Sequence, residues 1–177
     1  MEKPKGERRI ELAGPNPNWK AAFEAEARKL KPVFSDSIGL HHVGSTAIEG
    51  IKAKPVIDIL GVVKDIAVVS NYREEMEELG YEYKGENGLA GRRYFEKGQI
   101  QHTHHLHVFE AGNTEVERHL LFRDYLRAHR EEAQAYSKLK QRLAQEYRSD
   151  PAGYTEAKSD FIASIDEKAK LWRAREE

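Results

Sequence analysis

The spacing of apolar residues changes near Asn113, and this change constrains the fold more than any other feature of the 177-residue sequence. Before Asn113, short apolar runs recur with a period near two, which is typical of β-strands. After it, the period is close to three and a half, which is typical of amphipathic helices. The order predicts an α+β fold: a mixed or antiparallel β-sheet packed with helices, and a helical C-terminal part over residues 114–177.

Capping residues and turn signals give the expected elements. Asn18 is expected to cap the first helix, with Pro32 just beyond its end, and Asp65 the second, with Gly80 at its C-terminal cap. Helices are predicted over residues 18–31, 65–79 and 114–128, around 136–147, and as one helix from Pro151 through Trp172. Strands are predicted at residues 37–43, 56–63, 81–83, 92–96 and 103–110.

Length and composition limit the class of protein. A chain of 177 residues suits one domain over 1–177, with residues 1–9 as a flexible arm. Lys and Arg number 29 against 30 Asp and Glu, a net charge of −1, which argues against a general nucleic-acid binder. Cys is absent, so any metal must be bound by His, Asp, Glu or water. No apolar run has signal-peptide or membrane-span length, which predicts a cytoplasmic protein without a membrane partner.

The segment His41-His42-Val43-Gly44-Ser45-Thr46 ends a predicted strand and precedes a loop that contains Gly50. Because Gly44 has no side chain, backbone N–H groups and the hydroxyls of Ser45 and Thr46 can approach a phosphate closely. The segment lacks the terminal Gly-Lys-Ser/Thr of a Walker P-loop. An ordinary turn explains the same residues, so both interpretations remain open.

Asp58 interrupts a run of Val, Ile and Leu that is typical of a central strand. A buried carboxylate needs a partner or a metal ion. A strand end that opens on a cleft would supply one. A structural ion pair, with Lys54 or with an Arg of the C-terminal part, is the alternative.

Four of the eight His residues fall within residues 102–107. His105 and His107 alternate onto one face of a predicted strand, while His102 and His104 are expected to point the other way. Two imidazoles on one face can share a metal ion or a phosphate. Solvated or core-packed side chains are the alternative.

Several cations in the sequence are candidates for binding an anion. A surface charge stripe explains most of them equally well. Lys158 is different, because its helical phase places it with Tyr154 and Phe161 on the stripe that should face inward. The candidates are Arg92, Arg93, Arg123, Arg127 and Lys158.

Together these segments resemble the GrpB family, small bacterial proteins that look like members of the nucleotidyltransferase superfamily. The resemblance covers nearly the whole chain. In some related proteins such a domain is fused to dephospho-coenzyme A kinase, which hints at nucleotide or coenzyme chemistry. The segments that carry the resemblance are Trp19 with Phe23, residues 42–58, 104–108 and 122–127, and Tyr154 followed by Lys158.

Resemblance to nucleotidyltransferases implies a Gly-Ser turn that holds a triphosphate, two carboxylates spaced Asp-x-Asp and a third on a neighbouring strand. The carboxylates would bind two magnesium ions. Gly44 and Ser45 match the turn, and Asp58 matches one carboxylate. The positions two residues before and after Asp58 are Val56 and Leu60, so the Asp-x-Asp pair is incomplete.

The strand expected to give the third acid carries His105 and His107 instead. Imidazoles suit zinc, manganese or nickel better than magnesium, and as cations they can hold a phosphate directly. A divalent metal (Mg, Mn or Zn) is therefore the expected cofactor.

Two functions follow as expectations. The first is a metal-dependent nucleotidyltransferase acting on a nucleotide or other phosphorylated small molecule; the second is a non-catalytic module that binds a nucleotide or coenzyme in a degenerate site. A third possibility is an oligomeric scaffold with a vestigial site. The sequence does not decide whether the protein forms a homo-oligomer. The expected catalytic residues are Asp58, His105 and His107; the metal ligands are these three and His42; the phosphate-binding residues are Gly44, Ser45, Thr46, Lys54, Arg93, Arg123 and Lys158.

Overall fold

The computed structural model describes residues 10–176. The arm predicted for residues 1–9 lies outside the described residues. Five strands form one sheet in the order β1-β2-β5-β4-β3, in which β2 and β5 are parallel and the other pairs antiparallel. The strands are β1 (Ile38–Val43), β2 (Ile57–Val63), β3 (Tyr81–Tyr83), β4 (Arg93–Lys97) and β5 (His104–Glu110). The predicted mixed sheet is confirmed.

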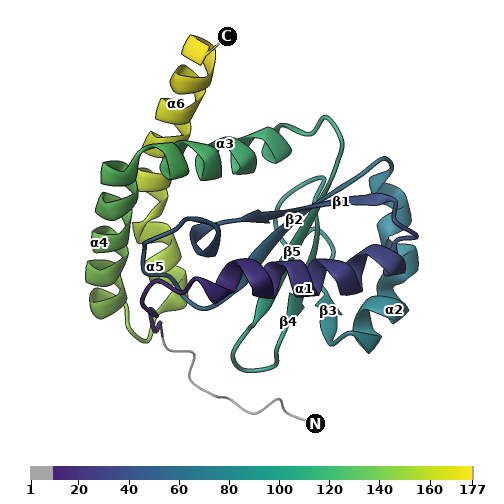
Figure 1. Ribbon diagram of the computed structural model, residues 1–177. Helices are drawn as coiled ribbons and strands as arrows, with labels where there is room; N and C mark the ends of the chain where they lie inside the picture. Colours follow the sequence, from purple (N-terminus) through teal and green to yellow (C-terminus); the bar gives the residue numbers. More distant parts are fainter. Residues whose placement is uncertain (1–9, 177) are drawn as a thin grey trace.

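The helices lie on both faces of the sheet and beside it. Figure 1 shows α1 lying across one face, with α4, α5 and α6 gathered at the side of the sheet. The predicted helical C-terminal third is confirmed. The α-helices are α1 (Asn18–Val33), α2 (Arg73–Glu78), α3 (Thr114–Ala128), α4 (Arg130–Glu146), α5 (Pro151–Ala157) and α6 (Ser159–Glu176); the 3-10 helices are η1 (Ser45–Ala47) and η2 (Ile66–Tyr72).

Two of the predicted helices are divided in the structure. The predicted helix 65–79 is two elements, because Ile66 to Tyr72 is rich in β-branched and turn-forming residues that disfavour an α-helix. Asp65 still caps its start, accepting a hydrogen bond from the N–H of Ala67 at 2.9 Å. The single helix predicted from Pro151 ends at Ala157, and α6 begins at Ser159. The apolar stripe continues across this break, so periodicity alone does not detect it.

At the first helix, Pro17 rather than Asn18 occupies the N-cap position, and Pro32 lies inside the last turn rather than beyond it. The side chain of Asn16 accepts a hydrogen bond from the Asn18 N–H at 2.9 Å. This contact satisfies one of the donors that a helix start leaves open.

Each face of the sheet has its own hydrophobic cluster. Under α1 the cluster includes Leu30, Ile59 and Leu106; on the other face Leu60 and Phe109 pack against partly buried residues of α3. A third cluster joins α3, α4 and α6, and a fourth contains Ile10, Leu143, Ala144 and Tyr154. The helical part therefore packs around cores of its own beside the sheet.

Within residues 10–176, none of the helices combines the length and the apolar character that a bilayer span requires.

Candidate functional site

Asp58 lies in a row of polar side chains that crosses three neighbouring strands. In the sheet register Asp58 of β2 is opposite His105 of β5, and His105 is opposite Glu96 of β4. Residues directly opposite on neighbouring strands point to the same face, and so does His107, two residues along β5. The alternation predicted for His105 and His107 is confirmed by this register.

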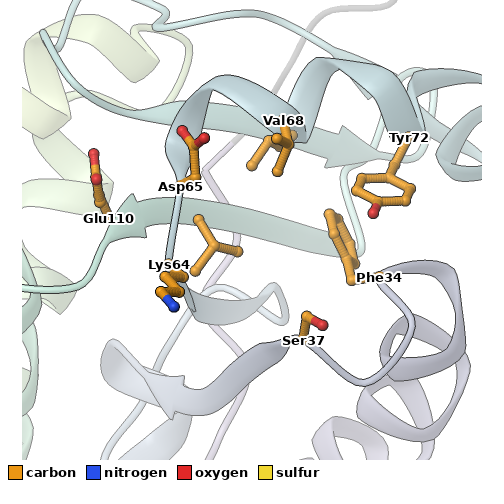
Figure 2. A pocket seen from close by; sticks show the side chains of 9 residues that line it. Phe34, Ser37, Lys64, Asp65, Val68, Tyr72 and Glu110 are labelled. Atoms are coloured by element: carbon orange, nitrogen blue, oxygen red, sulfur yellow. The ribbon is translucent and has the colours of Figure 1, made fainter.

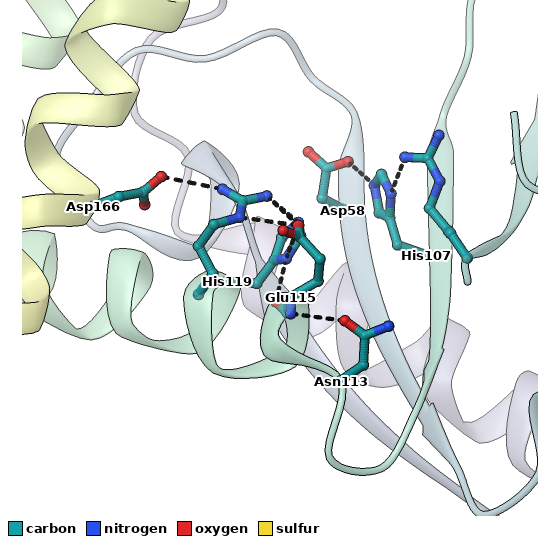
Figure 3. Close-up of polar contacts among 8 residues, drawn as sticks. Asp58, His107, Asn113, Glu115, His119 and Asp166 are labelled. Atoms are coloured by element: carbon teal, nitrogen blue, oxygen red, sulfur yellow. Dashed lines mark hydrogen bonds and ion pairs between the residues drawn. The ribbon is translucent and has the colours of Figure 1, made fainter. Parts of the chain in front are cut away.

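Both imidazoles contact the Asp58 carboxylate. The Nε2 of His107 is 3.2 Å from Asp58 Oδ1, and the Nδ1 of His105 is 3.6 Å from the same oxygen. Arg92 lies on the far side of His107, with its Nη1 3.5 Å from the ring Nδ1 (Figure 3). Burial acts to raise the pKa of Asp58, but hydrogen bonds and charge from His105 and His107 outweigh it and hold the pKa well below its usual range.

These three side chains suit a divalent metal ion. One ligand atom from each of Asp58, His105 and His107 lies within 4.8 Å of the others. Nitrogen and carboxylate oxygen together are donors for zinc or manganese. Without a metal, the same contacts join the carboxylate directly to the two imidazoles.

The turn after β1 comes close to Asp58. Gly44 has a φ of +73°, and a Cβ at this position would lie 2.7 Å from Asp58 Oδ2, so both the conformation and the space require glycine. Ser45 begins η1 and lies near the Tyr136 hydroxyl. Thr46 is buried, with its hydroxyl 2.8 Å from the Nε2 of His42. Gly44 and Ser45 therefore face the Asp58 site, whereas Thr46 faces away towards His42.

Three lysines gather beside this turn. The Nζ atoms of Lys54 and Lys158 lie 5.1 Å and 4.8 Å from the ring centroid of Tyr154. The Nζ of Lys140 lies 4.6 Å from the ring of Tyr136. The inward orientation predicted for Lys158 is confirmed.

Burial and mutual repulsion act on these ammonium groups. Burial lowers the pKa of Lys140 to about 7, helped by the charges of Lys158 and Lys54 and opposed by that of Asp58. Burial likewise lowers the pKa of Lys158 to about 8. Cations held this close together out of water favour an anion between them.

Two buried polar atoms at the same place have no hydrogen-bond partner within the described part of the chain: the Nζ of Lys140 and the hydroxyl of Tyr154. Lys140 is only 2% exposed. Buried donors are nearly always satisfied in folded proteins, so each unsatisfied one needs an explanation. An anion that accepts from both would provide it.

A network behind His107 ties α3 to α6. Arg118 donates to Glu115 at 2.8 Å and to Asp166 at 3.4 Å, and Asn113 caps α3 by accepting from the N–H of Glu115 (Figure 3). The ring centroids of His119 and His107 are 5.9 Å apart. Burial lowers the pKa of His119 to about 4. This neighbour is therefore neutral at pH 7 and leaves the charge at Asp58 unchanged.

The structure does not bring His42 to the predicted metal site. His42 lies opposite Ile59 in the register, one residue out of phase with Asp58, and its side chain is on the other face of the sheet. There it stacks on Phe23 with 5.0 Å between ring centroids, and burial lowers its pKa to about 4. It supports the turn through Thr46.

Arg93 and Arg123 do not reach the Asp58 cluster either. Arg93 is opposite Val108, on the face away from Asp58, and Arg92 takes the position beside His107. Arg123 donates to the carbonyl oxygen of His42 at 3.2 Å, and Arg127 to that of Ala47 at 2.8 Å. These two α3 arginines hold the backbone on either side of the turn.

Two cavities lie away from the cluster. One, of about 1000 Å³, is lined by residues of α1, β1, η1 and α3, among them His41, Arg123 and Arg127. The other, of about 530 Å³, is at the far end of β2, where Figure 2 shows Phe34 and Tyr72 on one side of it and Asp65 on the other. Its lining is largely apolar and includes no group from the row at Asp58.

Sequence reasoning missed three residues at the site. Lys140 follows Tyr136 by four residues and precedes Leu143 by three, so its helical phase was a signal. Glu96 shares the strand face of Tyr94. His102 was predicted to point away, but β5 begins only at His104, and His102 turns back so that its Nδ1 lies 2.9 Å from the Nε2 of His105.

Comparison with known proteins places the chain in a family. The family model described as GrpB protein matches residues 9–168. The UPF0157 protein YqkA of Bacillus subtilis is 46% identical over 167 residues, which cover 94% of this chain and 49% of the relative. The chain thus spans about half the length of that relative.

Two solved structures are similar to the model. The crystal structure of the conserved protein GrpB from Enterococcus faecalis is 41% identical, with a TM-score of 0.87 over 92% of this chain and 99% of that one. The Cid1 poly(U) polymerase with bound MgGTP has a TM-score of 0.52 at 15% identity, over 75% of this chain and 44% of that one. The second likeness concerns the fold, which is nucleotidyltransferase-like. The chain belongs to the GrpB family.

Proposed function

We propose that the protein binds a nucleotide or a related phosphorylated small molecule at the Asp58 site. The phosphates lie between the Gly44-Ser45 turn and the three lysines Lys54, Lys140 and Lys158. The observation that carries the proposal is the buried Lys140 ammonium, which lacks a hydrogen-bond partner within the described residues. A polyphosphate supplies both the charge and the acceptors that this group lacks.

The turn supports the same proposal. Gly44 lets the backbone of the turn pack directly against the Asp58 carboxylate, where a Cβ would lie 2.7 Å from Oδ2, so a phosphate bound by the turn would be close to a metal ion at Asp58. Asp58, His105 and His107 would hold that ion, which would screen the carboxylate from the phosphate and act as a Lewis acid on it. The lysines would neutralise the remaining negative charge.

If the protein is an enzyme, the reaction is nucleotidyl transfer. The oxygen of an acceptor hydroxyl bonds to the α-phosphorus, the bond from that phosphorus to the β-phosphate oxygen breaks, and pyrophosphate leaves. The lysines are placed to stabilise the charge on the departing pyrophosphate. The acceptor hydroxyl passes its proton to solvent, because the imidazoles of His105 and His107 are taken up as metal ligands.

The second candidate is a binding module without turnover. It is favoured by Val56 and Leu60, which stand where a second carboxylate of an Asp-x-Asp pair would be. Among the described residues, the ligand group around Asp58 contains one carboxylate and two imidazoles. Such a site would retain ligand affinity with one metal ion.

A thermal-shift panel tests binding, with ATP, GTP, CTP, UTP, coenzyme A and dephospho-coenzyme A, each with Mg²⁺, Mn²⁺ or Zn²⁺. A ligand at about 100 times its Kd stabilises by about 2.7 kcal/mol. For a chain of this size, that is a rise of about 5–10 °C in Tm. The response should disappear in Lys140→Met and persist in Lys138→Met, an exposed lysine on the same helix. No response to any compound contradicts the proposal.

Label transfer distinguishes the two candidates. The ligand that raises Tm is supplied with a labelled α-phosphate, together with candidate acceptors. Incorporation of label with release of pyrophosphate, lost in Asp58→Asn, identifies the enzyme. A tightly bound nucleotide that stays intact with all three metals identifies the binding module.

A further inference from the structure

A second cluster of potential metal ligands lies beside the first. Glu96, His102 and His105 each offer one ligand atom, and these atoms lie within 4.8 Å of one another. Glu96 comes from β4, His105 is directly opposite it on β5, and His102 lies in the segment just before β5. All three side chains are only partly exposed, at 12%, 11% and 24%.

The distances fit a metal ion bound by two imidazoles and a carboxylate. His102 Nδ1 lies 2.9 Å from His105 Nε2 and 3.4 Å from Glu96 Oε2. Two ligands about 2.1 Å from a tetrahedral zinc ion are about 3.4 Å apart. The cluster therefore needs only small movements to surround an ion.

The two nitrogens of His105 face different groups. Its Nδ1 faces Asp58 at 3.6 Å, and its Nε2 faces His102 at 2.9 Å. The lone-pair directions of the two ring nitrogens diverge, so one ion cannot use both. Each nitrogen belongs to a separate cluster, so His105 binds an ion in both only after it releases its N–H proton to solvent and bridges the two ions as an imidazolate.

The surroundings of Glu96 orient its carboxylate for this role. The Tyr94 hydroxyl donates to Oε2 at 3.2 Å, and Lys84 Nζ lies 3.4 Å from Oε1. Partners of this kind fix the direction of a ligating carboxylate. Lys84 thus occupies one oxygen, while the other faces His102.

We infer that Glu96, His102 and His105 form a second site for a divalent transition metal, with zinc as the best match. Two imidazoles and one glutamate are a ligand set used by zinc enzymes, which keep a fourth position for water or substrate. The site stands apart from the proposed nucleotide and its lysines. It shares only His105 with the metal site proposed at Asp58.

Metal titration of the full chain, after chelator treatment and without nucleotide, tests the inference. Zn²⁺ binding is measured by calorimetry, and Co²⁺ binding by visible absorption, which reports coordination geometry. The unmodified protein should bind two ions. His102→Ala and Glu96→Gln should each remove one of them, with a loss of affinity above about 100-fold, the upper end of what an outer partner costs.

Matched variants separate this site from the first. Asp58→Asn and His107→Ala should remove the other ion and leave the Glu96 site loaded, whereas His41→Ala, a histidine outside both clusters, should still bind two. If His102→Ala does not fold, as judged by circular dichroism, the nearly isosteric Glu96→Gln carries the test.

One ion that is unaffected by His102→Ala and Glu96→Gln overturns the inference, because the two rings then share only an N–H···N hydrogen bond. One ion that is lost in those variants but kept in Asp58→Asn supports it and contradicts the metal site at Asp58. No ion at all overturns both metal sites, while the thermal-shift panel still decides nucleotide binding.

Discussion

Lys140→Met is the most informative single change. It replaces a buried ammonium that has no hydrogen-bond partner among the described residues with an apolar side chain of similar length. Burial and the neighbouring lysines lower the pKa of Lys140 from 10.5 to about 7. At about 1.36 kcal/mol for each pH unit, this displacement limits the gain from removing the charge to about 5 kcal/mol. Because relaxation and water entry reduce such costs, we expect the free energy of unfolding to rise by about 1–4 kcal/mol at pH 7.

The pH dependence of this gain has a defined sign. Between pH 7 and 10.5 the unfolded chain holds a proton on Lys140 that the folded chain has released, so stability of the unmodified protein rises with pH. The advantage of Lys140→Met is therefore complete below pH 7 and shrinks towards pH 10. Ligand binding changes in the opposite direction to stability, because Lys140→Met lacks the proposed contact with the phosphate and should therefore bind the ligand more weakly.

Urea denaturation followed by circular dichroism at pH 6, 7, 8 and 9 measures both effects. Lys138→Met, an exposed position on α4, is the control and should change the free energy of unfolding by less than about 0.5 kcal/mol. The reasoning is refuted if Lys140→Met is less stable than the unmodified protein at pH 7, or if its advantage does not change with pH.

Three further outcomes are expected. Gly44→Ala should lower the free energy of unfolding by at least about 1 kcal/mol more than Gly88→Ala, because both have positive φ but only Gly44 is close to Asp58; equal losses in urea denaturation would contradict this. Asp58→Asn should have a lower free energy of unfolding than the unmodified protein at neutral pH. This difference in stability should vanish as acid protonates the Asp58 carboxylate, whose pKa His105 lowers from 3.8. A difference that persists in acid denaturation would contradict the prediction. ATP affinity, measured with EDTA above pH 7.5 where the phosphates are ionised, should fall as pH rises to 9 and Lys140 loses its proton, and the same fall should occur in Lys138→Met; an affinity independent of pH would exclude the lysine contact.

The sequence predicted the positions of helices and strands better than it predicted which side chains share a face of the sheet. The helix at 114–128 has the predicted bounds, because Asn113 supplies a capping side chain at its start. Asp58 and the alternating His105 and His107 were found because charge within a strand pattern stands out. Their partners depend on register, which no local pattern reveals.

The errors in the site have a common physical cause. His42 and Arg93 are each one residue out of phase with the Asp58 face, and a shift by one residue reverses the side of the sheet. Lys140 was overlooked because lysine on a helix is ordinarily solvated. Only the packing of Tyr136 and Tyr154 in the hydrophobic clusters of the helical part shows that this lysine is enclosed.

The groups of the candidate site come from parts of the fold with separate cores. Asp58 belongs to the sheet, whereas Lys140 and Lys158 belong to the C-terminal helices, whose hydrophobic clusters are distinct from the cluster under α1. A ligand held by both parts would crosslink them. Because α3 already packs against the sheet and against α6, such a ligand would add to existing contacts and make unfolding of the whole chain more cooperative.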